Sequence, residues 1–246
     1  MGAWALPSLD AKEEPSSTRI RFTTLSKATP SGLKSDSVLD LVQDLSGYIW
    51  LATDNGLSQF DGWETENYAY SPDGTTTLSS NRLTAVAAKS KSPGPLWIGT
   101  ASKGLMRFDQ PSGTASWILK GSTSAHALLS DTITDLAISE DKYLWIATDH
   151  GLNVLNLATE KIVVSEGPLS KTPIAFVSCQ RGSEVWVGTT AGELYKWNDT
   201  LAGFKKFWET SVPVTSVVAD AENRVWIGTA GLGQTSGLAH PMASPC

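Results

Sequence analysis

The 246-residue sequence lacks the features that mark several protein classes. Two cysteines, Cys179 and Cys246, are too few for a disulfide framework, and we do not expect them to pair. The 19 lysines and arginines are outnumbered by 25 aspartates and glutamates and form no basic cluster, which argues against nucleic-acid binding. No apolar run approaches the roughly 20 residues of a membrane helix. Any membrane attachment would therefore come from segments absent from this chain.

Signatures of catalysis are missing as well. No Gly-x-Ser-x-Gly, P-loop or His-Glu-x-x-His pattern occurs. The three histidines, His126, His150 and His240, are far apart and have no spacing typical of metal ligands. We therefore expect no catalytic residue, cofactor or metal site, and we do not expect this chain to be an enzyme.

Repetition is what the sequence has. An apolar residue, Trp, a second apolar residue, Ala or Gly, and Thr follow one another five times, with 40 to 48 residues between successive tryptophans. A period of this size is typical of solenoids and propellers. A strand that is apolar on both faces suits a sheet packed between two others, and the small residue should let the neighbouring sheet approach closely. The tryptophans are Trp50, Trp97, Trp145, Trp186 and Trp226.

Each repeat predicts four short antiparallel strands. In the first repeat the expected strands are Ser37–Asp44, Tyr48–Thr53, Leu57–Phe60 and Trp63–Tyr70, and Asp54-Asn55-Gly56 is a tight-turn signal between the second and third. Four strands in a period of this length match one blade of a β-propeller. The predicted fold class is therefore all-β, a β-propeller of four-stranded antiparallel blades with five repeats visible.

The expected boundaries are a flexible tail over residues 1–18, propeller blades over 19–240 and a C-terminal tail over 241–246. Two interpretations of the ends stay open. A strand predicted over residues 19–25 could pair with the last blade and close a five-bladed ring, which would remove free sheet edges. The repeat after Thr229 loses its pattern, however, and this favours a partial, N-terminal portion of a larger propeller.

The repeats resemble the two-component regulator propeller (Reg_prop) repeat. That repeat has an apolar-Ser-Asn/Asp-x-Val start, an Asp-x-x-Gly turn, the tryptophan strand and a Gly-Leu-x-x-Phe/Tyr-Asp close. The first repeat carries these elements at Leu33–Val38, Asp44–Gly47, Ile49–Thr53 and Gly56–Asp61, and the likeness covers most of residues 33–238. The chain departs from the usual seven repeats per propeller.

This resemblance implies the periplasmic input region of a bacterial transmembrane sensor, with a histidine kinase or diguanylate cyclase as output in a full-length parent. The implied role is ligand sensing or interaction, with an unknown small molecule, a glycan, or a second propeller or other protein as partner. Two alternatives stay open. One is a stand-alone protein–protein interaction scaffold. The other is a propeller lyase or hydrolase, which would need converging His, Glu or metal groups at the channel mouth.

Two places are candidate ligand-binding sites. An outer strand presents aromatic side chains in alternation, and these could face a glycan or a partner, although packing at the blade edge is the alternative. His150 occupies the turn position that Asn55 holds in the first repeat, so a structural role in the turn competes with a binding role. The aromatic residues are Trp63, Tyr68 and Tyr70, and the longer insertions are Ser71–Asn81, Lys89–Pro95 and Gly121–Asp131.

Overall fold

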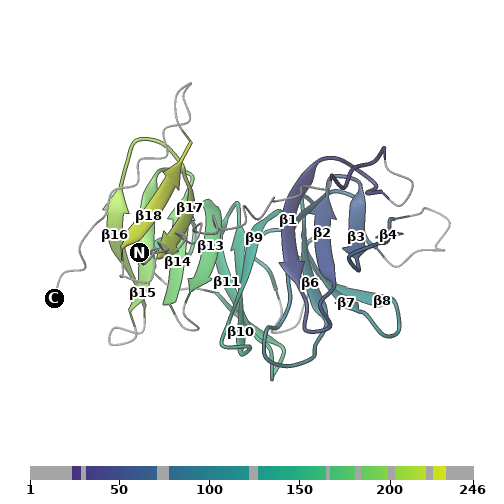
Figure 1. Ribbon diagram of the computed structural model, residues 1–246. Coiled ribbons are helices and arrows are strands. Elements are labelled where there is room, and N and C mark those ends of the chain that lie inside the picture. Colours follow the sequence, from purple (N-terminus) through teal and green to yellow (C-terminus); the bar gives the residue numbers. More distant parts are fainter. Residues whose placement is uncertain are drawn as a thin grey trace, which may run out of the picture.

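The computed structural model describes residues 24–28, 32–70, 78–121, 127–164, 167–180, 184–198, 203–219 and 224–230. Within these ranges the strands form five antiparallel sheets in chain order, which we number blades 1 to 5. Four of the sheets contain four strands, and blade 5 contains two described strands. Figure 1 shows the blades side by side around an arc, with blade 1 at one end and blade 5 at the other.

Each four-stranded blade follows the chain from one edge of its sheet to the other. Blade 1 consists of β1 (Val38–Gln43), β2 (Ile49–Thr53), β3 (Gly56–Phe60) and β4 (Thr65–Tyr68). Blade 2 consists of β5 (Leu83–Ala87), β6 (Leu96–Thr100), β7 (Leu105–Asp109) and β8 (Thr114–Ile118).

The remaining blades repeat this order. Blade 3 consists of β9 (Ile133–Ser139), β10 (Tyr143–Thr148), β11 (Gly151–Asn156) and β12 (Lys161–Val164). A short 3-10 helix, η1 (Gly167–Leu169), precedes blade 4, which consists of β13 (Ile174–Gln180), β14 (Glu184–Thr189), β15 (Glu193–Asn198) and β16 (Gly203–Glu209). Blade 5 contains β17 (Val214–Ala219) and β18 (Val225–Thr229).

The predicted fold class is confirmed: the described chain is built of four-stranded antiparallel β-blades. The tryptophan strand is the second strand of every blade and pairs on both sides in blades 1 to 4. In blade 3, for example, Trp145 lies opposite Ala137 of β9 and Val154 of β11. The predicted N-terminal tail over residues 1–18, most of the strand predicted over residues 19–25, residues 231–240 and the C-terminal tail lie outside the described residues. Residues 71–77 and 122–126 of the insertions do as well.

The cores lie between blades. The indole of Trp50 in blade 1 packs with Leu83 and Val86 of blade 2, and the same relation recurs at each of the other described junctions. At the last junction Trp186 of blade 4 meets Val214 and Val217 of blade 5. A thin four-stranded sheet cannot bury both of its faces alone, so each blade depends on its neighbours for its hydrophobic stabilisation.

The threonine that ends each tryptophan strand organises the following turn. Thr53 Oγ1 donates to the carbonyl of Gly56 at 2.7 Å and accepts from the amide of Asn55 at 3.1 Å. Thr148 makes the same two bonds, with Gly151 and His150. Gly56 and Gly151 have φ values of 111° and 133°, a region that favours glycine. The repeated Thr and Gly are therefore explained by turn chemistry.

The residue two positions after the tryptophan is small for different reasons in different blades. At Gly99 an added Cβ would lie 2.7 Å from Ile133 Cγ2 of the next blade, so close approach of the neighbouring blade is the constraint, as the sequence predicts. At Gly188 the added Cβ would collide with the ring of Phe176, on the adjacent strand of its own blade. Here the side chain of the inner strand, and not the next blade, requires glycine.

The burial of the tryptophans predicts a graded effect of truncation. Trp186 is 1% exposed, whereas Trp226, whose blade has no described neighbour on that side, is 39% exposed. We expect Trp186→Ala to lower the free energy of unfolding by about 3–5 kcal/mol through lost burial and a residual cavity. Trp226→Ala should cost less, because its indole is only partly buried and its removal leaves a smaller enclosed cavity. Urea unfolding of both variants measures the difference, and equal losses would contradict the inter-blade core.

Candidate functional site

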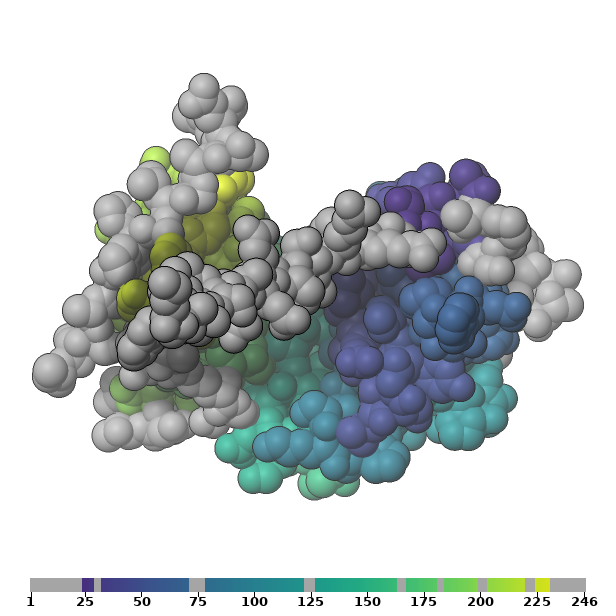
Figure 2. Space-filling model, viewed as in Figure 1, coloured from purple at the N-terminus to yellow at the C-terminus, as the bar shows by residue number. Residues whose placement is uncertain are grey.

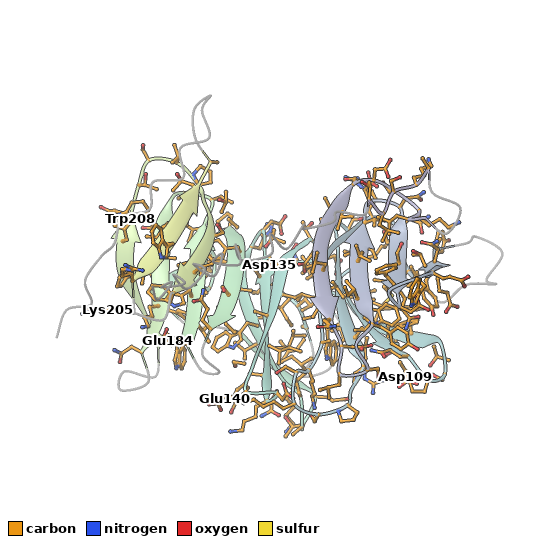
Figure 3. The ribbon with its side chains drawn as sticks, viewed as in Figure 1. Asp109, Asp135, Glu140, Glu184, Lys205 and Trp208 are labelled. Atoms are coloured by element: carbon orange, nitrogen blue, oxygen red, sulfur yellow. The ribbon has the colours of Figure 1, made fainter. Side chains whose placement is uncertain are left out.

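The first strands of the blades line the inside of the arc. β1, β5, β9, β13 and β17 each contact the next one in chain order. A cavity of about 540 Å³ opens on these strands. Its volume lies within the range of about 300–1,000 Å³ that small-molecule sites occupy. The concave side of the arc is therefore the candidate site. Figure 3 shows Asp135 near the middle of the arc, while Asp109 of β7 and Trp208 of β16 lie away from it on either side.

The charged side chains of the described cavity wall are all acidic. Three carboxylates line it, from Asp40, Asp135 and Asp141, and no Lys, Arg or His is among the described residues that do. Apolar residues, among them Leu41, Val86 and Val217, also line the cavity. Such a wall attracts cations and hydroxyl groups and repels anions. The cavity is also lined by residues with hydroxyl or thiol side chains, namely Ser90, Ser178, Thr215, Ser216 and Cys179.

Two of the carboxylates also join neighbouring blades. Asp40 Oδ2 on β1 accepts the amide of Val86 on β5 at 2.7 Å, and Asp135 Oδ2 on β9 accepts the amide of Val177 on β13 at 2.9 Å. The other oxygen of each carboxylate accepts the amide of the next residue in its own strand, at 2.8 Å in both cases. A carboxylate that accepts two amides holds the inner strands of two blades in register.

Other side chains make different links on the same side of the arc. Gln180 on β13 donates to the carbonyl of Val217 at 2.7 Å and accepts the amide of Ala219, both on β17. Asp141, in the turn between β9 and β10, accepts the amides of Ser90 and Lys91 from the blade 2 insertion, at 3.0 and 2.7 Å. Polar side chains therefore connect blade 1 to 2, 2 to 3, 3 to 4 and 4 to 5.

Burial changes the protonation of this wall. Burial raises the pKa of Asp135 to about 7 against the lowering effect of the Val177 and Leu136 amides, and the charge of Asp40 adds a smaller repulsion. Burial likewise raises the pKa of Asp40. Burial and the nearby Asp135 raise the pKa of the Cys179 thiol to about 12, which makes it a poor nucleophile at neutral pH. Asp135 therefore titrates near physiological pH.

The structure does not bring the three predicted aromatic residues onto one face. Trp63 lies in the turn before β4 and is 89% exposed, while Tyr70 lies beyond the other end of β4. Tyr68 points between blades 1 and 2, where its ring centroid lies 5.9 Å from that of Trp50 and 5.3 Å from that of Phe108. Tyr68 thus contributes to packing, whereas the indole of Trp63 is exposed and does not lie on one face with Tyr68 and Tyr70.

His150 lies in the β10–β11 turn. Its amide donates to Thr148 Oγ1 at 3.1 Å, and its Nδ1 lies 2.9 Å from Asp149 Oδ1. The side chain is exposed and does not line the cavity. This geometry matches the structural role in the turn that the sequence offers as the alternative to ligand binding.

Asp40 and Asp135 are not among the site residues predicted from the sequence, although the sequence carries a signal for them. Both stand ten residues before the tryptophan of their repeat, inside strands that are otherwise mostly apolar. A charged residue at one fixed position of an apolar strand needs a partner when it is buried.

In the part of the chain that the structure describes, no group of three or more His, Cys, Asp or Glu side chains could hold a metal ion. None of the helices in the described ranges has the length and hydropathy to cross a bilayer.

The arc is similar in structure to extracellular domains of bacterial signalling proteins. No protein-family model matches the chain. The extracellular domain of a hybrid two-component system from B. thetaiotaomicron is 25% identical with a TM-score of 0.68, over 81% of this chain and 28% of that chain. The extracellular domain of a one-component system from the same bacterium is 18% identical with a TM-score of 0.66, over 88% and 31%.

Two further comparisons are narrower. A stretch of 48 residues is 40% identical to Histidine kinase P4 of Formosa agariphila, over 20% of this chain and 4% of the kinase. Virginiamycin B lyase from Staphylococcus aureus is 12% identical with a TM-score of 0.59, a likeness that shows the fold alone. The chain spans less than a third of the signalling proteins that it matches. Its similarity to extracellular domains of two-component systems is thus shown, while the specific Reg_prop assignment stays a prediction.

The cavity carboxylates predict how stability depends on pH. Because the folded-state pKa of Asp135 is raised to about 7 from an ordinary value of 3.8, its favourable contribution is complete below about pH 4 and is lost as the pH rises through 7. Between pH 5.5 and 8.5 we expect a loss of about 2 kcal/mol in the free energy of unfolding. Asp135→Asn should remove most of this slope, which urea unfolding at the two pH values measures.

Asp141→Asn is the matched control. Although burial works in the opposite direction, hydrogen bonds from Ser90, Lys91 and Ser92 hold the pKa of Asp141 below its ordinary value. Its contribution is therefore complete above about pH 4 and constant between pH 5.5 and 8.5. This variant should lose the same stability at both pH values and keep the wild-type slope. A slope unchanged by Asp135→Asn would show that another group titrates.

Proposed function

We propose that this chain is the ligand-sensing part of the extracytoplasmic input region of a bacterial transmembrane signalling protein. The observation that carries the proposal is the likeness to the extracellular domain of a hybrid two-component system, at 25% identity over 81% of this chain. A histidine kinase or diguanylate cyclase output would belong to the longer protein, and a periplasmic location follows from the same assignment.

The concave cavity gives the proposed ligand a place. Its wall offers carboxylates and hydroxyls to polar groups and apolar side chains to a ligand body, and the described lining carries no positive charge. These groups suit a neutral molecule rich in hydroxyls or a small organic cation, and they disfavour an anion. A glycan fragment belongs to the first of these classes.

The position of the cavity suits sensing. Residues of β1, β5, β9, β13 and β17 line it together, so a ligand there touches all five inner strands. A ligand shifts an equilibrium between two arrangements only by its difference in affinity for them. A molecule that contacts several blades at once would bind a tighter arrangement of the arc with a different affinity from a looser one. Binding would therefore shift the equilibrium between these arrangements, and the rest of the longer protein could respond to that shift.

A binding function fits this wall better than a catalytic one. Described residues at the cavity include no histidine, and the carboxylates of Asp40 and Asp135 are both engaged by backbone amides. The likeness to a lyase concerns the fold, which hosts unrelated functions. We therefore assign binding without turnover to this chain.

A thermal-shift screen of the purified chain tests the proposal. The probes are neutral oligosaccharides, aliphatic diamines and, as a negative set, dicarboxylates. A ligand at about 100 times its dissociation constant adds about 2.7 kcal/mol to stability, which is a shift of several degrees for a domain of this size. We expect a shift from one of the first two sets, with the ligand recovered unchanged. A shift from no probe, or from dicarboxylates alone, would contradict the proposal.

A cavity variant locates the site. Ser178→Phe places a large ring at the cavity wall and should abolish the shift, while Trp117→Ser, which changes an exposed side chain on β8, should keep it. In cells that carry the complete gene, Ser178→Phe should likewise abolish ligand-dependent output. Retention of the shift in a folded Ser178→Phe protein would place binding elsewhere.

A further inference from the structure

The indole N–H groups of the blade tryptophans have different partners from one blade to the next. Trp50 Nε1 donates to Asp44 Oδ2 at 2.8 Å, and Trp145 Nε1 donates to Ser139 Oγ at 2.9 Å. In both blades the acceptor stands two residues after the one that pairs with the tryptophan in the register of the sheet. At this position a blade can therefore supply the acceptor for its own indole.

In blade 4 the residue at this position is Gln180. Ser178 pairs with Trp186, and Gln180 follows two residues later. The indole N–H of Trp186 is nevertheless buried without an acceptor among the described residues. Such a donor costs free energy, because it has given up its hydrogen bond to water. Blade 4 thus has an acceptor at the equivalent position, and that acceptor does not serve the indole.

Gln180 is bonded to the next blade instead. Its Nε2 donates to the carbonyl of Val217 at 2.7 Å, and its Oε1 accepts the amide of Ala219, so it joins β13 of blade 4 to β17 of blade 5. In Figure 2 the green and yellow atoms of these two blades lie together at one side of the molecule, apart from the purple and blue atoms of blade 1. The same side-chain amide is therefore in demand from two directions, its own blade and the next one.

Blade 2 shows that an unpaired indole does not by itself imply a second arrangement. The indole N–H of Trp97 is also buried without an acceptor in the described part of the chain. Ala87 pairs with Trp97, so the equivalent position is Lys89, whose side chain has no acceptor atom. Trp97 has no acceptor to gain at this position, whereas Trp186 has one.

We propose that Gln180 switches the junction of blades 4 and 5 between two arrangements. In the arrangement described above, Gln180 links β13 to β17. In the other, its Oε1 accepts the indole N–H of Trp186, as Asp44 and Ser139 do in their blades, and the link to β17 is released. Each arrangement satisfies polar groups that the other leaves unpaired, so the exchange replaces hydrogen bonds by hydrogen bonds of comparable strength.

The switch lies beside the proposed ligand cavity. Cys179 on β13 and Val217 on β17 both line the cavity, and these are the two strands that Gln180 links. Under the proposed function, a ligand that contacts both strands would favour the linked arrangement. The switch itself does not depend on that function, and it can be tested without a ligand.

Nuclear magnetic resonance of the ¹⁵N-labelled full chain tests the switch through its indole N–H signals. Trp186→Phe removes the indole N–H and thereby assigns the Trp186 signal. Gln180→Ser introduces the acceptor that blade 3 uses and is too short to reach β17, so it should hold the indole bonded. Gln180→Met keeps the length of the side chain without an amide, so it should leave the indole unpaired. We expect a wild-type signal between those of the two variants, or two signals at their positions.

Two further readouts complete the test, with circular dichroism to confirm that each variant is folded. Both Gln180 variants lose the link to β17, so the Ala219 amide should exchange with solvent about tenfold faster or more in each. The Trp97 signal should stay the same in all variants. A single wild-type Trp186 signal that coincides with that of Gln180→Met and shows no relaxation dispersion would overturn the switch. So would identical Trp186 signals in Gln180→Ser and Gln180→Met, or unchanged exchange at Ala219.

Discussion

Burial of an indole between neighbouring sheets is the interaction on which this structure depends. In blades 1 to 4 the tryptophan lies on the second strand, and its indole packs against aliphatic side chains of the following blade. Sheets with two apolar faces have no stable existence in isolation. Each blade is therefore stabilised by its neighbours. Equivalent side chains are buried between blades and more exposed at the two ends of the arc.

Hydrogen bonds between the inner strands of successive blades also fix how the blades align. Asp40 and Asp135 use their carboxylates to hold the next blade's inner strand, while Gln180 makes a comparable link with an amide. These bonds bring acidic groups to a partly buried wall, and burial raises the pKa of Asp135 to about 7. The groups that fix the blades are thus also groups that a ligand in the cavity would meet. Protonation and blade register therefore depend on the same carboxylates, and the ligand binding proposed above would act on them too.

The comparisons agree with this interpretation and set its scope. Extracellular domains of bacterial signalling proteins share the architecture over most of this chain, while the chain spans less than a third of their length. Virginiamycin B lyase shares the fold at 12% identity. Propeller architecture therefore does not decide function, and the proposed binding role depends on the cavity wall, whose described lining has no histidine.

The sequence alone determined the all-β class, the blade as a unit and the role of most repeated residues. The tryptophan spacing marks the period of the repeat, and the turn glycines and terminal threonines are local signals because each acts within its own hairpin. The tertiary structure decided what meets at the axis. Asp135 and Val177 are brought together only when blades stack, and Tyr68 turns into a junction although its alternation with Trp63 and Tyr70 suggested an exposed face. Exposure of Trp226 likewise depends on which blade adjoins it, and contacts between repeats cannot be read from a pattern confined to one repeat.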